Sequence, residues 1–211
     1  MQPRKKLWMI LVLLSALLVL LTACSSTKLV SSWHKPDHTA QPLQKVLILG
    51  VMPNDLQRRT IEDAFLQRLA KESVTGIAGY TLMNNPDDYD EIAEIREAVH
   101  KSGADAAMII TLVENKEQER YVPPSVDYIP SYGMGYGFYN YYGMSYQAVY
   151  RPGYKTIDQI VKLETTVFLT ETEEMIWAGS TESFNPPSTD KIVSENTNLI
   201  VESMKKAGLI K

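Results

Sequence analysis

The first residues in this sequence whose types and spacing suit metal binding are His34, Asp37 and His38. Imidazole nitrogens and carboxylate oxygens are ligands of several metals. Pro36 lies inside the group, however, and breaks any helix that would present these side chains together. We therefore expect a solvated segment at this place, with no bound metal and no cofactor.

Two acidic groups have residue types suited to general acid catalysis, namely Glu62 with Asp63 and the run from Glu171 to Glu174. Catalysis would require two such groups to converge on a substrate, whereas these belong to a predicted helix face and a predicted turn, both solvated. The sequence also has no Gly-rich phosphate loop, no G-x-S-x-G or H-E-x-x-H motif and no paired cysteines. We therefore expect that the protein is not an enzyme.

Cys24 is the only cysteine of the chain, so no disulfide can form within it. Basic residues at positions 4 to 6 precede the unbroken apolar run LWMILVLLSALLVLL of residues 7–21, a layout typical of a secretion signal. The alternative is an uncleaved membrane anchor, for which the run is short, because about 20 apolar residues are needed to cross a bilayer. The run ends in LTAC, residues 21–24, which resembles the lipobox of bacterial lipoproteins.

The lipobox resemblance implies a signal peptide over residues 1–23 and lipidation of Cys24. In that family the cysteine thiol receives a diacylglyceryl group, and the new amino group is usually acylated. Two or three acyl chains hold a protein on a membrane durably, so the membrane is the first expected partner. Ser25 and Ser26 stand where an Asp would retain a lipoprotein at the inner membrane. The resemblance thus implies the outer membrane, with the domain facing the periplasm.

Composition and charge limit the number of domains and the kinds of partner to be expected. A chain of 211 residues with 45% hydrophobic content can bury one core of normal size, so one globular domain with appendages is expected. Removing the signal takes away Arg4, Lys5 and Lys6 and changes the net charge from −4 to −7. An acidic protein without a basic stripe is poorly suited to nucleic acid, which we therefore do not expect as a partner.

The rest of the chain alternates strand and helix patterns after a Ser- and Pro-interrupted tether over residues 24–44. Strands are predicted at 45–51, 77–83, 105–114, 161–170 and 175–183, and helices at 54–75, 88–101 and 189–207. The order β-α-β-α-β-insert-β-β-α predicts a single α/β domain, formed by residues 45–122 and 155–211. Its sheet should be mixed, with the first three strands parallel and the helices packed on the sheet.

Local patterns predict how these elements pack. The continuous apolar run KVLILGV at 45–51 is typical of a strand covered on both faces, and Gly76 should end the first helix, which Asn54 should cap. Apolar residues also recur at helical spacing and on one side of a strand. They are Ile61, Phe65 and Leu69 in the first helix, and Val161, Leu163, Val167 and Leu169, with Thr165 among them, in the fourth strand.

The segments KVLILGV, SGADAAMIITLVE, MIWAGSTES and MKKAGLI, in this order, are similar to a group of proteobacterial lipoproteins of unknown function. More distantly, they resemble the sheet-and-helix domains of penicillin-binding-protein activator lipoproteins and of the curli secretion lipoprotein. The resemblance spans most of residues 45–210 and contains no catalytic motif. It implies an α/β fold in the cell envelope, and it does not extend to residues 123–154.

Residues 123–154 form a Tyr- and Gly-rich insert, with ten tyrosines from Tyr121 to Tyr154 inclusive. In SYGMGYGFYNYYGMSY, residues 131–146, large side chains occupy alternate positions, as in a ribbon with one bulky face. The pattern mirrors about Asn140 and predicts a hairpin centred there, although the composition also suits a disordered segment. Candidate partner contacts are Tyr132, Tyr136, Phe138, Tyr142 and Tyr146.

Two functional hypotheses follow from these patterns. The first is a non-catalytic, lipid-anchored envelope lipoprotein that acts as a binding or assembly module, with an envelope protein or a second copy as its partner. Tyrosine suits such contacts because it offers a large apolar area and one hydroxyl for few rotatable bonds. The alternative is a glycan-binding or glycan-processing lipoprotein of the cell envelope that uses the same aromatic side chains as a platform.

Overall fold

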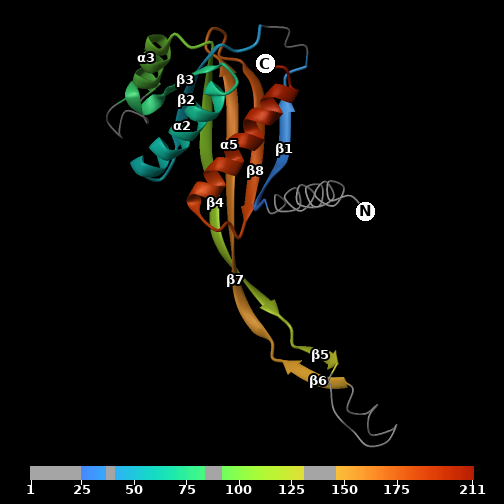
Figure 1. Cartoon of the computed structure of the whole chain (residues 1–211). Coiled ribbons are helices and arrows are strands. Elements are labelled where there is room, and N and C mark those ends of the chain that lie inside the picture. The colour runs from blue at the N-terminus through green and yellow to red at the C-terminus, as the bar shows by residue number, and fades with distance from the viewer. Residues whose placement is uncertain (1–24, 37–40, 84–91, 131–145) are drawn as a thin grey trace, which may run out of the picture. The chain divides into compact units, whose positions relative to one another are not determined.

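The computed structural model describes residues 25–36, 41–83, 92–130 and 146–211 (Figure 1). The described chain forms two compact units. The first contains the described residues up to Asn115 together with Val161–Lys211, and the second contains the described residues of Lys116–Ile160.

The described residues of the chain form a six-stranded mixed sheet in the order β1-β8-β7-β4-β2-β3, together with a two-stranded sheet. Strand β2 pairs in parallel with β3 and with β4, whereas β1 pairs antiparallel with β8. The strands of the larger sheet are β1 (Thr27–His34), β2 (Lys45–Val51), β3 (Thr75–Ala78), β4 (Ala106–Val122), β7 (Tyr154–Leu169) and β8 (Met175–Phe184). The predicted mixed α/β architecture is confirmed, and so is the parallel pairing among its first three predicted strands.

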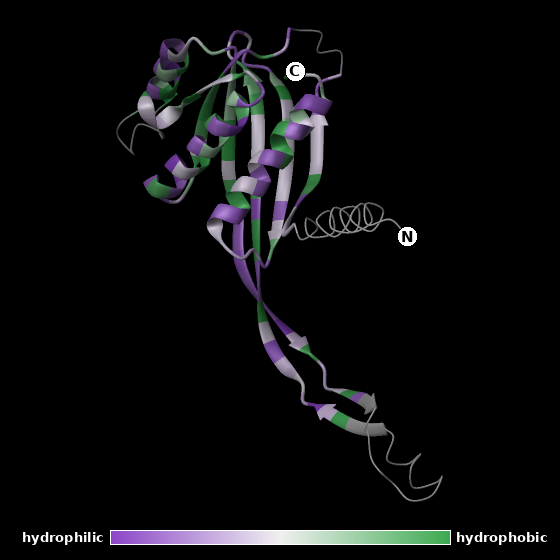
Figure 2. Ribbon diagram, viewed as in Figure 1, coloured by the Kyte–Doolittle hydropathy of each residue, from purple (hydrophilic) through white to green (hydrophobic). Residues whose placement is uncertain are grey.

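Among the described residues, three helices cover this sheet: α2 (Asp55–Ala70), α3 (Ile92–Ser102) and α5 (Thr189–Lys206), with a short 3-10 turn η2 (Gly79–Thr81) after β3. Apolar side chains of α2 and α5 form the larger core cluster with one face of the sheet. Apolar side chains of α3 pack with the other face in a smaller cluster. Figure 2 shows the apolar residues, in green, on the strands next to α2 and α5.

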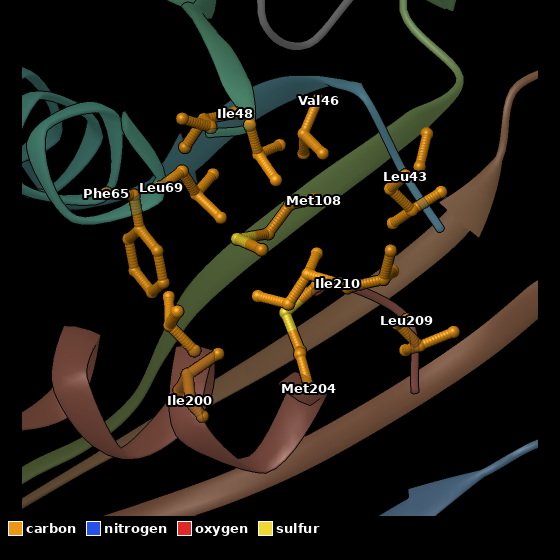
Figure 3. Packing of buried hydrophobic residues seen from close by; sticks show 14 of the residues in the cluster. Leu43, Val46, Ile48, Phe65, Leu69, Met108, Ile200, Met204, Leu209 and Ile210 are labelled. Carbon is orange, nitrogen blue, oxygen red and sulfur yellow. The ribbon is translucent and has the colours of Figure 1, made fainter. Parts of the chain in front are cut away.

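Strand β2 lies between both clusters, as its continuous apolar run predicted. Val46 and Ile48 belong to the cluster under α2 and α5, and Leu47 and Leu49 belong to the cluster under α3. Successive side chains of a strand point to opposite faces, so residues 46–49 alternate between the two cores. Val51, the last residue of β2, is 52% exposed and belongs to neither core. Figure 3 shows the larger cluster, in which side chains of α2 and α5 meet Ile48 and Met108.

The predicted cap at the start of the first helix is confirmed. The Asn54 side chain accepts a hydrogen bond of 2.9 Å from the Gln57 backbone N–H at the start of α2. Ser188 likewise accepts a hydrogen bond of 3.2 Å from the N–H of Lys191 at the start of α5. After α5, Gly208 has φ +76°, which glycine adopts without the steric cost that a side chain would add.

The predicted role of Gly76 is wrong. Helix α2 ends at Ala70, and Gly76 lies inside β3, which spans Thr75–Ala78 and not the predicted 77–83. A Cβ atom at Gly76 would lie 2.7 Å from Cδ2 of Leu66 on α2. Glycine is therefore needed for the close approach of strand and helix, and not for a helix terminus.

The prediction of a tether over residues 24–44 is wrong for residues 27–34, which form β1 at the edge of the sheet. The pairing with β8 runs from Thr27 opposite Ser183 to His34 opposite Trp177. An edge strand pairs on one side only and can be largely solvated, so a Ser-rich sequence without a strong apolar pattern can form one. Residues 37–40 lie outside the described residues.

Strands β4 and β7 are both longer than predicted. Strand β4 continues from the apolar segment through the charged run NKEQERY to Val122, and β7 begins at Tyr154 rather than at residue 161. Between them, β5 (Ser125–Pro130) and β6 (Tyr146–Arg151) pair antiparallel as the two-stranded sheet. The second unit, residues 116–160, is therefore wider than the predicted insert of residues 123–154.

Candidate functional site

The second unit exposes aromatic and aliphatic side chains and has no apolar core among its described side chains, residues 116–127 and 149–160. Its exposed large hydrophobic residues are Tyr121 (62% exposed), Val126 (50%), Tyr150 (64%), Tyr154 (61%) and Ile157 (62%). The one buried side chain in this described part is polar, Asp158. This pattern of burial is opposite to that of an independently folded domain, which buries its apolar side chains.

Backbone pairing and cross-strand ion pairs hold this unit together. In β5 and β6 the register runs from Ser125 opposite Arg151 to Pro130 opposite Tyr146. Between β4 and β7, Arg120 donates from Nε to Oδ2 of Asp158 at 2.6 Å and from Nη2 to Oδ1 at 3.3 Å. Two further pairs are Lys155 with Glu119 (2.9 Å) and Arg151 with Asp127 (2.7 Å). Both partners of these two further pairs are exposed, and such pairs stabilise by at most about 1 kcal/mol each, so they do not replace a core.

Both sides of this unit are interrupted at the same level. Residues 123–124, both proline, separate β4 from β5, and residues 152–153, Pro-Gly, separate β6 from β7. Proline has no N–H to donate to a strand ladder, so pairing stops on both sides here. A Cβ atom at Gly153 would lie 2.4 Å from the hydroxyl oxygen of Tyr121. Glycine thus allows the Tyr121 ring to lie against the backbone at this interruption.

Most of the predicted site residues lie outside the described residues. These are Cys24, Tyr132, Tyr136, Phe138 and Tyr142. Tyr146 is the first residue of β6, where it pairs with Pro130. A hairpin centred on Asn140 would instead place Tyr146 opposite Met134, so the predicted register is wrong at Tyr146.

Exposed tyrosines that the sequence analysis did not single out lie at the base of the same segment. Tyr121, Tyr150 and Tyr154 are described and exposed, and they lie outside the regular pattern of residues 131–146 from which the contacts were predicted. The feature of the sequence that could have identified them is the count of ten tyrosines from Tyr121 to Tyr154.

The second unit is electrically neutral in an acidic chain. Its four basic residues match its four acidic ones: Lys116, Arg120, Arg151 and Lys155 against Glu117, Glu119, Asp127 and Asp158.

Glu62 corrects the prediction of a solvated carboxylate on α2, because its side chain is fully buried (0% exposed). The carboxylate accepts hydrogen bonds from the backbone N–H groups of Gly50 (2.9 Å) and Tyr80 (3.0 Å). Burial raises the pKa of the Glu62 carboxyl, and this outweighs the hydrogen bonds and the nearby Arg58 charge, which lower it.

The other acidic residues considered as general acids make contacts that differ from those of Glu62. Asp63 accepts a hydrogen bond of 2.7 Å from the hydroxyl of Tyr80, and the Arg59 guanidinium lies 4.6 Å from the centre of the same ring. The other predicted acids, residues 171–174, are exposed in the turn between β7 and β8, as expected. The contacts of Glu62 and Asp63 thus join α2 to the end of β2 and to η2, which follows β3.

Over the described ranges, no group of three or more His, Cys, Asp or Glu side chains is placed to hold a metal ion. His34 lies in β1, and its predicted companions Asp37 and His38 lie outside those ranges. No helix in the described part of the chain is long and apolar enough to cross a membrane.

Comparisons with known proteins return structures only. No family model matches the chain, and no curated protein matches its sequence. A PelC dodecamer from Paraburkholderia phytofirmans is similar over 84% of this chain and 94% of that chain, with 9% identity and a TM-score of 0.44. The lipoprotein GNA1162 from Neisseria meningitidis is similar over 77% of this chain and 99% of that chain, with 12% identity and a TM-score of 0.42.

Proposed function

We propose that this protein is a non-catalytic, lipid-anchored module of the bacterial cell envelope that binds a partner protein or a second copy of itself through residues 116–160. One observation carries the proposal. The described part of this unit combines exposed aromatic side chains, such as Tyr150 and Tyr154, with a complete lack of buried apolar side chains.

The energetics favour a contact surface over an idle loop. A two-stranded hairpin is at best marginally stable alone in water, because it has too little apolar surface to bury on itself. Covering exposed tyrosines with a partner removes apolar area from water, at about 25 cal/mol per Å². Aromatic residues are enriched in interface cores, where charged residues are depleted. A neutral unit in a chain of net charge −4 also weakens repulsion between copies.

The anchor belongs to the same proposal and rests on the sequence LTAC at residues 21–24. Glu195 on α5 accepts hydrogen bonds from the N–H groups of Ser26 (3.1 Å) and Thr27 (2.9 Å), two and three residues after Cys24. A lipid on Cys24 would thus be attached beside the first unit. By the lipobox resemblance, the location proposed is the outer membrane, with the domain facing the periplasm.

The contact surface is tested by crosslinking in cells. A photoreactive amino acid is placed at Tyr150 or Tyr154 in the full chain, and Leu56 on α2, which is 76% exposed, serves as a matched control in the first unit. We expect crosslinked products from the two tyrosine positions and not from Leu56. A product of twice the chain mass would identify a second copy, and another mass would identify a partner protein. Equal products from all three positions, or none from the tyrosines, would contradict the proposal.

The anchor is tested separately by Cys24→Ala, with Ser25→Ala as the control. We expect the Cys24 variant to remain uncleaved or to leave the membrane fraction, and the Ser25 variant to behave as the parent does. Acylation and membrane retention of Cys24→Ala would show that the lipobox interpretation is wrong while leaving the contact surface untested by this measurement.

A further inference from the structure

Strand β1 presents alternate side chains to two faces of the sheet. Its pairing places Ser31 opposite Ser180 and Trp33 opposite Ala178, whereas His34 is opposite Trp177. Successive side chains of a strand point to opposite faces. Ser31 and Trp33 therefore share one face, and Ser32 and His34 share the other.

A cavity lies beside β1 on the face of Ser31 and Trp33, with a volume of about 270 Å³. Small residues of β8, including Ala178 and Ser180, line it together with Thr166 of β7. Its two large lining side chains are Trp33, which is 44% exposed, and the exposed Glu164. This cavity thus offers one indole ring and one carboxylate above a floor of small residues.

A second cavity lies on the opposite face, between β1 and α5, with a volume of about 420 Å³. Its lining includes the apolar residues Leu29, Trp177, Leu199 and Ala207. Polar residues complete it, namely Ser32, His34, Glu202, Ser203 and Lys206. The two cavities therefore lie on either side of the same strand, and Ser32 lines both.

The outer edge of β1 is available for pairing. Strand β1 is the last strand of its sheet, and no described strand pairs with it on the side away from β8. The register with β8 shifts between Leu29 and Ser31, and regular pairing continues from Ser31 to His34. An edge of this kind presents a row of backbone N–H and C=O groups to an added strand.

We propose that β1 is the docking edge for an extended segment of a partner protein in which a Lys or Arg residue is followed directly by an apolar residue. Backbone hydrogen bonds to residues 31–34 would supply the pairing, as in other cases of strand addition. Neighbouring side chains of the added strand point to opposite faces. The basic side chain would enter the first cavity, beside Trp33, and the apolar side chain would enter the second cavity, between β1 and α5.

Charge and ring chemistry select this occupant. A cation above the Trp33 indole is attracted by the ring face, and the Glu164 carboxylate can accept its N–H donors. The chain without residues 1–23 carries a net charge of −7, which favours a basic ligand over an acidic one. The second cavity has an apolar wall formed by Trp177 and Leu199, which suits an aliphatic side chain. The proposal is independent of the contacts proposed for residues 116–160.

The probe is a fluorescent, end-blocked octapeptide TVTRLTVT, titrated against the full chain in detergent and followed by fluorescence anisotropy. We expect saturable binding that weakens about tenfold when the peptide Arg is replaced by Glu, because like charges then meet at Glu164. We also expect loss of binding when alternate peptide amides are N-methylated, because N-methyl groups block strand pairing.

Matched protein variants complete the test. Trp33→Ala and Glu164→Gln should each weaken binding of TVTRLTVT about fivefold. Phe184→Ala, at 48% exposure, and Glu171→Gln in the exposed turn should leave it unchanged. Equal affinity for the Arg and Glu peptides, binding that survives N-methylation, insensitivity to both test variants, or no saturable binding would each overturn the proposal. Unchanged melting temperatures of the variants verify that folding is not the cause.

Discussion

The Glu62 carboxylate on α2 accepts a hydrogen bond of 2.9 Å from the backbone N–H of Gly50 near the end of β2. Its other oxygen accepts from the N–H of Tyr80, at 3.0 Å, just after β3. One buried side chain thus satisfies a backbone donor within β2 and another just after its parallel neighbour β3. Buried N–H groups without an acceptor are costly, so Glu62 supports the fold at this edge of the sheet.

Glu62→Gln should lower the free energy of unfolding by about 1–3 kcal/mol. The amide has one oxygen, so one of the two N–H groups would face an NH₂ group instead of an acceptor. Urea unfolding at neutral pH measures the change, with Glu94→Gln on the exposed side of α3 as the control. Equal unfolding midpoints for both variants would mean that the Glu62 hydrogen bonds contribute nothing measurable.

Glu195 should make stability fall in acid. Burial acts to raise the pKa of Glu195, but hydrogen bonds from Thr27, Lys191 and Ser26 outweigh it and lower the pKa from 4.5 to about 2. Because the folded value is the lower one, ionised Glu195 stabilises the folded state above about pH 4.5, and this contribution is lost as the pH falls toward about 2.

The acid effect is measured by urea unfolding of the parent and of Glu195→Gln between about pH 6 and pH 2. The parent should be the more stable protein at the upper end, and the difference between the two should shrink toward the lower end. A difference that stays constant over the whole range would contradict the assigned role. Glu171→Gln in the exposed turn controls for general charge effects.

Gly76→Ala should destabilise the first unit by about 1–3 kcal/mol, a typical cost of overpacking. The new methyl group would lie 2.7 Å from Cδ2 and 3.3 Å from Cα of Leu66, so α2 would have to move away from β3. Thermal unfolding compares it with Thr75→Ala, a change at an exposed position of the same strand. If both variants melt alike, the approach of α2 to β3 is looser than described.

Replacing residues 125–151 with a short Gly/Ser linker should leave the melting temperature of the first unit nearly unchanged. No described side chain of this segment belongs to either core cluster, and a doubling of loop length changes closure entropy by only about 0.6 kcal/mol. Crosslinking from Tyr154, which this variant keeps, should disappear at the same time. A large fall in melting temperature would show that the tyrosines stabilise the fold, and unchanged complexes would show that they are not the contact surface.

The sequence predicts the central elements because each is specified by its own local pattern. The run KVLILGV at residues 45–51 can bury its successive apolar side chains only if both faces of the strand are covered. Strand β2 indeed lies between the two core clusters. Asn54 and Ser188 cap helices through bonds to residues three positions later, which sequence spacing shows directly. Alternation from Val161 to Leu169 likewise marks the buried side of β7.

The features that sequence reasoning missed depend on distant partners. Strand β1 exists because β8, some 150 residues later, offers an edge, and Ser31 or Ser32 gives no local sign of this. Glu62 looks solvated on a helix diagram, and its burial depends on N–H groups of Gly50 and Tyr80. The charged end of β4 has no apolar alternation, so that pattern does not predict it as a strand. It is joined to β7 through residues such as Arg120.

The hydrogen bonds from Ser26 and Thr27 to Glu195 set how far the domain can move from a lipid on Cys24. Two residues of fully extended chain span at most about 7 Å, whereas a flexible chain of twenty residues would have an end-to-end distance of about 25 Å. An acylated protein would therefore stay close to the lipid headgroups. It would meet components that lie at the same bilayer, and those on the far side of the periplasm would have to come to it.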